Sequence, residues 1–256
     1  GFMMTFMPAL SMPFMKKITG GDGFAMGHFG ITTYALSGFV GQFVGDPEDS
    51  TEKMKFPNWI GFMSEPLVAM GTVMLLIYII VGLLSGPAAS QQLGQYWIVG
   101  ALMSSLRFAG GIAIILLGVR TVLAEIVPAF RGIAEKIVPD AKPALDCPVV
   151  FPYAPNAVLL GYLTSIVGGL VAMVLQLIAA GKLGGVILPS MIVHFFVGGT
   201  AGVFGNSTGG KKGAIIGGLL NGFIFTLLAG TTYMSFGGLN PEWVGSSFGD
   251  TDFGVL

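Results

Sequence analysis

The chain of 256 residues is 53% hydrophobic and only 10% charged, with a formal net charge of −1. Because soluble domains carry about 25% charged residues, this shortage of charge predicts a membrane protein. The near-neutral chain has no basic patch, which argues against a nucleic-acid partner, and its single cysteine, Cys147, excludes an intrachain disulfide framework.

The chain opens within an apolar, Met-rich segment over residues 1–15, which contains Pro8 and Pro13 and ends at Lys16 and Lys17. Prolines remove backbone donors, so we expect them to end this segment together with the lysines. The start shows no basic region followed by an apolar stretch and a cleavage site, which a signal peptide would need. We expect both ends of the chain to continue in a longer membrane protein.

The next segment, residues 19–33, is apolar but interrupted by glycines, which weaken a regular helix. It is therefore a candidate re-entrant turn with His28 at its tip, where the glycines would let the backbone approach a ligand. Residues 46–58 are the most hydrophilic of the chain and must be solvated.

Apolar segments long enough to cross a membrane follow along the chain. We expect spans near residues 67–86, 97–127, 157–180, 184–204 and 213–234. The second is longer than a minimal span and should tilt. Residues 129–138 mix apolar and charged side chains at helical spacing, which predicts a separate interfacial amphipathic helix. The positive-inside rule places the loops 46–58, 128–142 and 205–212 in the cytoplasm.

Residues 145–161 form a proline-interrupted apolar segment between the predicted spans. Pro148, Pro152 and Pro155 prevent a continuous helix over 146–155, yet the side chains between them are apolar. Irregular backbone within a membrane is tolerated only where protein buries it or where it lines a polar cavity, which predicts a second re-entrant segment. An ionisable residue at that depth, Asp146, is a functional-site hypothesis. The alternative is a connector in which Asp146 caps the helix that starts near Asn156.

Two further patterns in the sequence suggest phosphate or metal binding. Gly205-x-x-x-x-Gly210-Lys211-Lys212 nearly spells a phosphate-binding loop, but Lys212 stands where Ser or Thr would bind magnesium and no strand precedes it, so we predict a tight turn. His28 and His194, the only histidines, offer too few ligands for a metal, even with Cys147 and Asp146. We expect His194 to be a buried, hydrogen-bonded residue, and we expect neither a metal nor a cofactor.

Four motifs together resemble one family. They are Asp146-Cys-Pro followed by Ala154-Pro-Asn-Ala-Val158, the glycine-rich Gly20-Gly-Asp-Gly-Phe-Ala-Met-Gly-His28, Gly118-Val-Arg-x-x-x-Ala-Glu125, and Gly202-Val-Phe-Gly-Asn206. In order and spacing they resemble the ascorbate-type membrane component, enzyme IIC, of the bacterial phosphoenolpyruvate-dependent phosphotransferase system. The likeness covers nearly the whole chain, which would lack the first spans of a full member and its last one.

The resemblance implies an all-α, polytopic, homodimeric permease of the bacterial inner membrane. Residues 66–127 would match helices of the dimerising domain, and residues 1–65 and 128–256 would match a core that carries the sugar by an elevator-type movement. The family binds L-ascorbate between its re-entrant turns, which implies His28 and Asp146 as ligand-binding residues here. The subunit would not be an enzyme in itself, because phosphate reaches the sugar from soluble IIA and IIB partners.

One position departs from the family pattern. The residue that follows the histidine is polar in the family and touches the substrate, whereas here it is Phe29. A lost hydrogen-bond partner is worth about 1–3 kcal/mol when a group is left unpaired, so a related small sugar acid or polyol is an alternative ligand. Two other functions also stay open, an ion-coupled transporter of the same fold and an intramembrane enzyme that uses Asp146 and His28 as acid and base. In a purely structural membrane protein, Asp146→Asn would change nothing.

Overall fold

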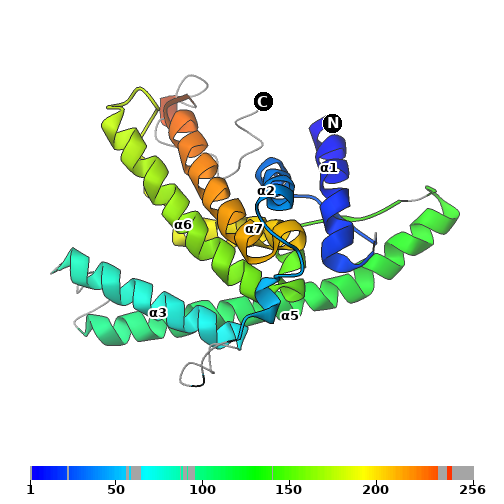
Figure 1. Ribbon diagram of the computed structural model, residues 1–256, viewed down its shortest axis with the longest axis horizontal. Helices are drawn as coiled ribbons and strands as arrows, with labels where there is room; N and C mark the ends of the chain where they lie inside the picture. The colour runs from blue at the N-terminus through cyan, green and yellow to red at the C-terminus, as the bar shows by residue number, and fades with distance from the viewer. Residues whose placement is uncertain are drawn as a thin grey trace. The chain divides into compact units, whose positions relative to one another are not determined.

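The computed structural model describes residues 2–21, 23–55, 65–86, 96–139, 141–235 and 241–243, together with the single residues 58, 88 and 91. Helices dominate these residues (Figure 1): α1 (Phe2–Thr19), α2 (Ile31–Val44), α3 (Pro66–Ser85), α5 (Trp97–Lys136), α6 (Pro155–Ile178) and α7 (Met191–Ser235). Short 3₁₀ helices lie at Thr51–Lys53 (η1), Cys147–Tyr153 (η3) and Pro241–Trp243 (η5), and two-residue strands at Ala25–Met26 (β1) and Ala144–Leu145 (β2).

Among the described residues, four helices are long and apolar enough to span a membrane. They cover Leu67–Ser85, Trp97–Lys136, Pro155–Ile178 and Met191–Thr232. Leu67–Ser85 and Pro155–Ile178 are close to the roughly 20 residues that cross the hydrocarbon, and the other two helices are about twice as long. The predicted all-α, polytopic fold class is confirmed. Whether the segments around His28 and Asp146 dip into a bilayer as re-entrant turns stays a prediction.

The chain folds as two compact units. One unit comprises residues 1–53 and 123–256, and the other comprises residues 54–122. The first holds α1, α2, the strands, α6 and α7; the second holds α3 and most of α5. The roles that we predicted for residues 66–127 and for the flanking core stay predictions.

Prolines interrupt the helices less than we predicted. Helix α1 runs through Pro8 and Pro13, and α5 runs through Pro128, so residues 129–136 extend α5 and the predicted separate amphipathic helix is wrong. Apolar helices tolerate proline because neighbouring groups and Ser or Thr hydroxyls satisfy the freed backbone atoms.

The loop predicted at residues 205–212 is also wrong in extent. Helix α7 continues to Gly209, and only Gly210 leaves the helical conformation, with φ 56° and ψ −145°. A Cβ atom at Gly205 would lie against Gly213, although eight residues of a straight helix would separate them by about 12 Å. The chain therefore turns sharply at Gly210, and α7 consists of two helical halves.

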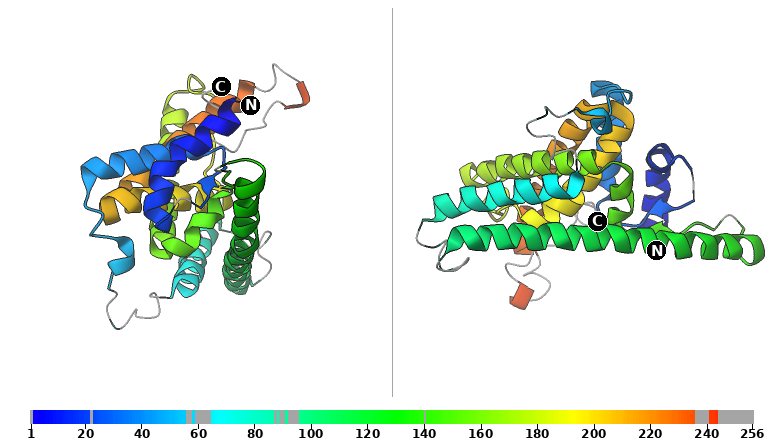
Figure 2. Two further views of the ribbon diagram at one scale, coloured as in Figure 1. Left: turned by 90° about the vertical axis from the view of Figure 1, so that its right-hand side faces the viewer. Right: turned by 90° about the horizontal axis from the view of Figure 1, so that it is seen from below.

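Small residues let α6 lie directly against α7 (Figure 2). A Cβ atom on Gly161 would come within 2.6 Å of the Gly202 Cα atom, and one on Gly222 within 2.7 Å of the Ser165 Cα atom. Helices in membranes associate through such close backbone contacts. Residues 184–190, predicted as the start of a span, are not helical and belong to the connection 179–190 between these two helices.

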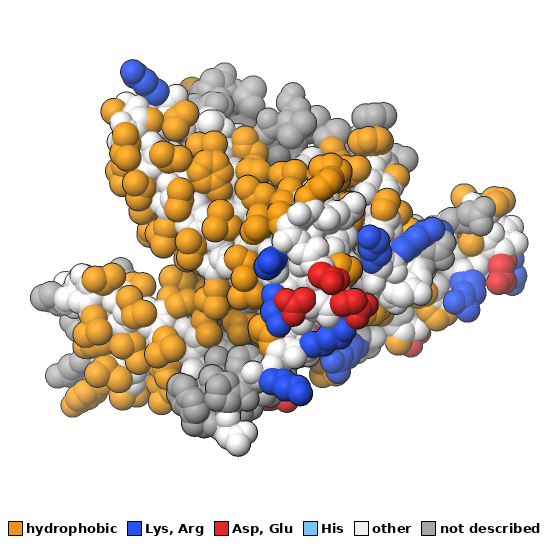
Figure 3. Space-filling view, in the orientation of Figure 1, with side chains coloured by type: hydrophobic (Ala, Val, Ile, Leu, Met, Phe, Trp, Pro, Cys, Tyr) orange, Lys and Arg blue, Asp and Glu red, His pale blue; other side chains and the backbone are white. Residues whose placement is uncertain are grey.

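The described surface is divided by side-chain type. Apolar side chains cover the outer side of α6, as expected for contact with lipid (Figure 3). Leu170, Val174 and Ile178 on this helix are 41%, 47% and 74% exposed. Charged side chains gather instead around η1 and the segment before it, which matches the solvated loop predicted at residues 46–58 (Figure 3).

Candidate functional site

A two-stranded parallel pairing joins the two segments that the sequence singled out. Ala25 lies opposite Ala144, and Met26 lies opposite Leu145. The Gly27 N–H continues the pairing by donating to the Leu145 carbonyl at 2.7 Å. A Cβ atom at Gly27 would come within 2.9 Å of the Ala144 carbonyl carbon, so only glycine allows this approach. Because the strands are parallel, the residues that follow them emerge at the same end.

Those residues are His28 and Asp146. The Nε2 atom of His28 lies 3.7 Å from the Oδ1 atom of Asp146. The imidazole is largely covered, with 19% of its side chain exposed, whereas the carboxylate is 73% exposed. Two groups 118 positions apart in the sequence therefore face each other, as the two-turn interpretation expects.

Asp146 also has a local structural role. Its Oδ1 atom accepts a hydrogen bond of 2.7 Å from the Cys147 N–H, which caps η3. The alternative that Asp146 caps the helix starting near Asn156 is therefore wrong: α6 begins at Pro155 and another residue caps it. As predicted, residues 146–155 do not form a continuous α-helix, because the backbone of Asp146 is extended and η3 contains prolines.

The orientation of the His28 ring follows from its other nitrogen. Nδ1 accepts a hydrogen bond of 3.0 Å from the Gly30 N–H, which can only donate. The Tyr34 hydroxyl lies 2.9 Å from the same nitrogen, and its ring stacks on the imidazole at a centroid distance of 5.7 Å. Because Nδ1 accepts, the neutral ring carries its proton on Nε2. The site thus presents an N–H donor beside a carboxylate acceptor.

The hydrogen bond that Nδ1 of His28 accepts also argues against a metal ion at this site. Ligand atoms of His28, Asp146 and Cys147 lie within 4.8 Å of one another, so the residue types could serve Zn²⁺. A metal bound to Nε2 of His28 would require the ring proton to lie on Nδ1, from which metal-bound histidines normally donate a hydrogen bond. In this site Nδ1 faces the Gly30 N–H, which is itself a donor. The geometry suits a ligand with hydroxyl groups better than a cation.

Phe29 and Tyr34 lie next to His28 in this site. Phe29 follows His28 directly, and its ring is 45% exposed. Tyr34 is fully buried in α2 and was missed from the sequence, because nothing in a six-residue spacing after a glycine-rich turn indicates contact with His28. His194 is buried, as expected, and bonds to Ser165 and Thr226.

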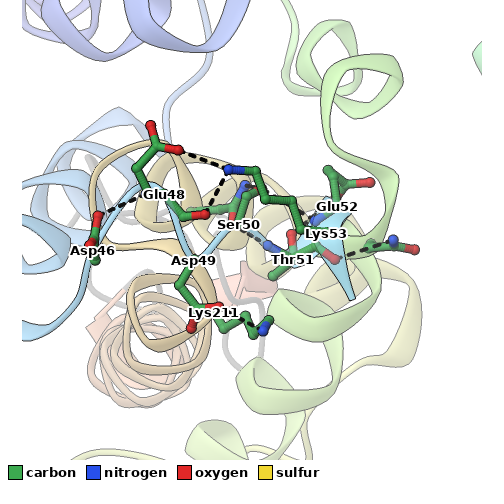
Figure 4. Close-up of polar contacts among 10 residues, drawn as sticks. Asp46, Glu48, Asp49, Ser50, Thr51, Glu52, Lys53 and Lys211 are labelled. Atoms are coloured by element: carbon green, nitrogen blue, oxygen red, sulfur yellow. Dashed lines mark hydrogen bonds and ion pairs between the residues drawn. The ribbon is translucent and has the colours of Figure 1, made fainter. Parts of the chain in front are cut away.

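A second polar cluster lies at η1 (Figure 4). The Glu52 carboxylate accepts from the Ala157 N–H at 3.1 Å and thereby caps α6. Glu52 as a whole is exposed, but its carboxylate lies against the first turn of α6. This partial burial raises the pKa of Glu52, and the hydrogen bonds from Ala157 and Thr51 oppose the rise.

The same loop also fixes the turn of α7. The Thr51 N–H donates to the Asn206 side chain at 2.9 Å, and Lys211 pairs with the Asp49 carboxylate at 2.7 Å. The segment around η1 therefore ties the start of α6 to the Gly210 turn, and Asn206 of the fourth sequence motif has a structural role here.

Comparison with known proteins decides the family. Residues 1–252 match the family described as "PTS system sugar-specific permease component". The chain belongs to this family. The resemblance read from the four motifs is confirmed, and with it a multi-pass protein of the inner membrane.

One curated relative carries a more specific description. The chain is 26% identical over 231 residues to a protein described as "Ascorbate-specific PTS system EIIC component" from Mycoplasma pneumoniae (strain ATCC 29342 / M129 / Subtype 1). The match covers 78% of the chain and 34% of the relative, so the chain spans about a third of that protein's length.

Proposed function

We propose that the chain forms part of a permease subunit that imports L-ascorbate, or a related small sugar acid or polyol, for phosphorylation during uptake. Family membership supports a sugar permease, and the description of the Mycoplasma relative supports ascorbate. The observation that carries the proposal for this chain is the pairing of His28 and Asp146 at the end of β1 and β2.

The chemistry of that pair suits an acidic polyol. A hydroxyl group placed between the two side chains accepts a hydrogen bond from His28 Nε2–H and donates one to the Asp146 carboxylate. The donor also stabilises a deprotonated enediol oxygen, since a charge-assisted hydrogen bond is about twice as strong as a neutral one. Phe29 supplies an apolar surface beside these polar groups, where a polar residue would bind a further hydroxyl. The proposed binding residues are therefore His28, Phe29 and Asp146.

The proposal extends to movement and partners. Residues 1–65 and 128–256 form the sugar-carrying core, residues 66–127 belong to the domain that contacts a second copy, and the core moves in an elevator-type step. Soluble IIA and IIB subunits supply the phosphoryl group from the cytoplasm. The permease itself then needs no nucleophile, and Cys147, which is 3% exposed, is poorly placed to be one.

Uptake of labelled L-ascorbate into cells that express the whole permease with its IIA and IIB partners tests this function. We expect uptake to stop when phosphoenolpyruvate is depleted, to survive an ionophore, and to leave phosphorylated sugar inside the cell. Uptake that ignores phosphoenolpyruvate but stops with the ionophore would establish an ion-coupled transporter instead. Conversion of the sugar by the purified subunit alone would establish an intramembrane enzyme.

A further inference from the structure

A row of buried hydrogen bonds runs through the core of the larger unit toward His28. It links side chains of α7 and α6 to α2, and its members are Thr226, His194, Ser165, Asn221 and Thr33, of which all but Thr33 (3%) are 0% exposed. Buried polar groups within apolar helices are costly unless every one is paired, so such a row calls for a reason.

The distances define the row step by step. Thr226 Oγ1 lies 3.3 Å from Nε2 of His194, and Ser165 Oγ lies 2.8 Å from its Nδ1. Ser165 also reaches the Asn221 Oδ1 atom at 3.4 Å. The Asn221 Nδ2 atom then donates to the Thr33 hydroxyl at 2.8 Å.

The row ends on the turn that carries His28. The Thr33 hydroxyl donates to the Gly30 carbonyl at 3.0 Å, and the Gly30 N–H donates to Nδ1 of His28 at 3.0 Å. Thr33 and His28 thus hold Gly30 from both sides. One residue, Gly30, therefore links Thr33 to the imidazole of His28.

One assignment of donors and acceptors satisfies every bond in the row. The Asn221 amide fixes the direction, because its Nδ2 donates to Thr33 and its Oδ1 must therefore accept from Ser165. Ser165 has one hydroxyl proton, so Nδ1 of His194 donates to Ser165 and its Nε2 accepts from Thr226. The two histidines consequently hold opposite tautomers, Nδ1–H in His194 and Nε2–H in His28.

We propose that Thr33 and Asn221 are positioning residues that hold the His28 turn so that its Nε2–H faces Asp146. Both residues are buried, and they act on His28 through Gly30. This inference rests on the proposed function for its purpose, because a fixed donor matters where a hydroxyl must be oriented, but the tautomers follow from the hydrogen bonds alone.

Substitution of Thr33 tests the proposal. Thr33→Val keeps the shape and removes the hydroxyl, whereas Thr33→Ser keeps the hydroxyl and is the matched control; Thr33→Ala serves if the valine variant does not fold. In the whole permease labelled with ¹³C,¹⁵N-histidine, the imidazole signal lost in His28→Ala is that of His28, and the signal lost in His194→Ala is that of His194. Spectra are recorded at about pH 8, above the ordinary histidine pKa of about 6.5.

We expect the wild type and Thr33→Ser to show His28 as Nε2–H and His194 as Nδ1–H. We expect Thr33→Val to give a mixture of His28 tautomers and about tenfold weaker binding of L-ascorbate by calorimetry, which corresponds to 1.4 kcal/mol. Identical His28 signals in Thr33→Val and wild type, or equal changes in the valine and serine variants, would overturn the proposal. The tautomer measurement needs no ligand, so it separates failure of the positioning from failure of sugar binding.

Discussion

At the scale of single residues, backbone groups orient the two side chains of the proposed binding site, His28 and Asp146. The Gly30 N–H sets the tautomer of His28, and the Cys147 N–H occupies one lone pair of Asp146. Both contacts come from residues within two positions in the chain. The two groups are thus oriented locally, and the pairing of β1 with β2 brings them together.

Glu52 offers a test at this scale. Partial burial raises its pKa, so between the ordinary value of 4.5 and the raised value the folded state holds the proton more tightly than the unfolded chain. The contribution of Glu52 to stability therefore falls as the pH rises through that window. Glu52→Gln keeps an acceptor for the Ala157 N–H and cannot ionise. We expect it to match the wild type at about pH 4 and to melt at a higher temperature than the wild type at about pH 8.

The matched variant is Glu52→Ala, which removes the cap. We expect it to have a free energy of unfolding about 1 kcal/mol lower than that of Glu52→Gln at both pH values, as other lost helix caps do. Thermal unfolding followed by circular dichroism measures all three proteins. A glutamine variant that is less stable than the wild type at the higher pH would show that the ionised carboxylate stabilises α6.

At the scale of elements, the sequence predicted which segments are helical better than where helices stop. Apolar length identified α3 and α6 nearly to the residue, because lipid imposes a span length. Proline was a poor guide to helix ends, since α1 and α5 pass through theirs. The strands β1 and β2 could not be foreseen, because two residues carry no periodicity and the pairing depends on contacts between distant segments.

The contact between α6 and α7 gives a prediction at this scale. Gly222→Ala would place a Cβ atom against the backbone of Ser165, which cannot move aside without shifting a helix. We expect a loss of about 1–3 kcal/mol of stability, as in other overpacked cores. Gly118→Ala on α5 is the control, because nothing lies within 4 Å of its added Cβ. The control should be neutral or more stable by up to about 1 kcal/mol. Equal melting temperatures for the two variants in detergent would contradict this contact.

At the scale of the whole molecule, the sequence motifs predicted the family and the two turns that carry His28 and Asp146. They did not predict the buried polar side chains that pack around the His28 turn. The glycine-rich turn and the proline-rich turn are visible in the sequence because both depart from helical patterns. Tyr34, Asn221 and Ser165 lie inside ordinary apolar helices, where a polar residue gives no sign of its partner. Their contacts follow only from how α2, α6 and α7 pack.

The proposed function requires His28 and Asp146 to bind one sugar molecule together. A double-mutant cycle measures this by calorimetry with L-ascorbate on the whole permease, using His28→Ala, Asp146→Asn and both, with Glu135→Gln on the exposed side of α5 as the control carboxylate. We expect each single variant to lose about 1.5–3 kcal/mol of binding free energy, as for hydrogen bonds to charged groups, and the control to lose none. The double variant should lose at least about 0.5 kcal/mol less than the sum of the two, because one ligand bridges both groups. Unchanged affinity in both single variants, or strictly additive losses, would contradict a shared site.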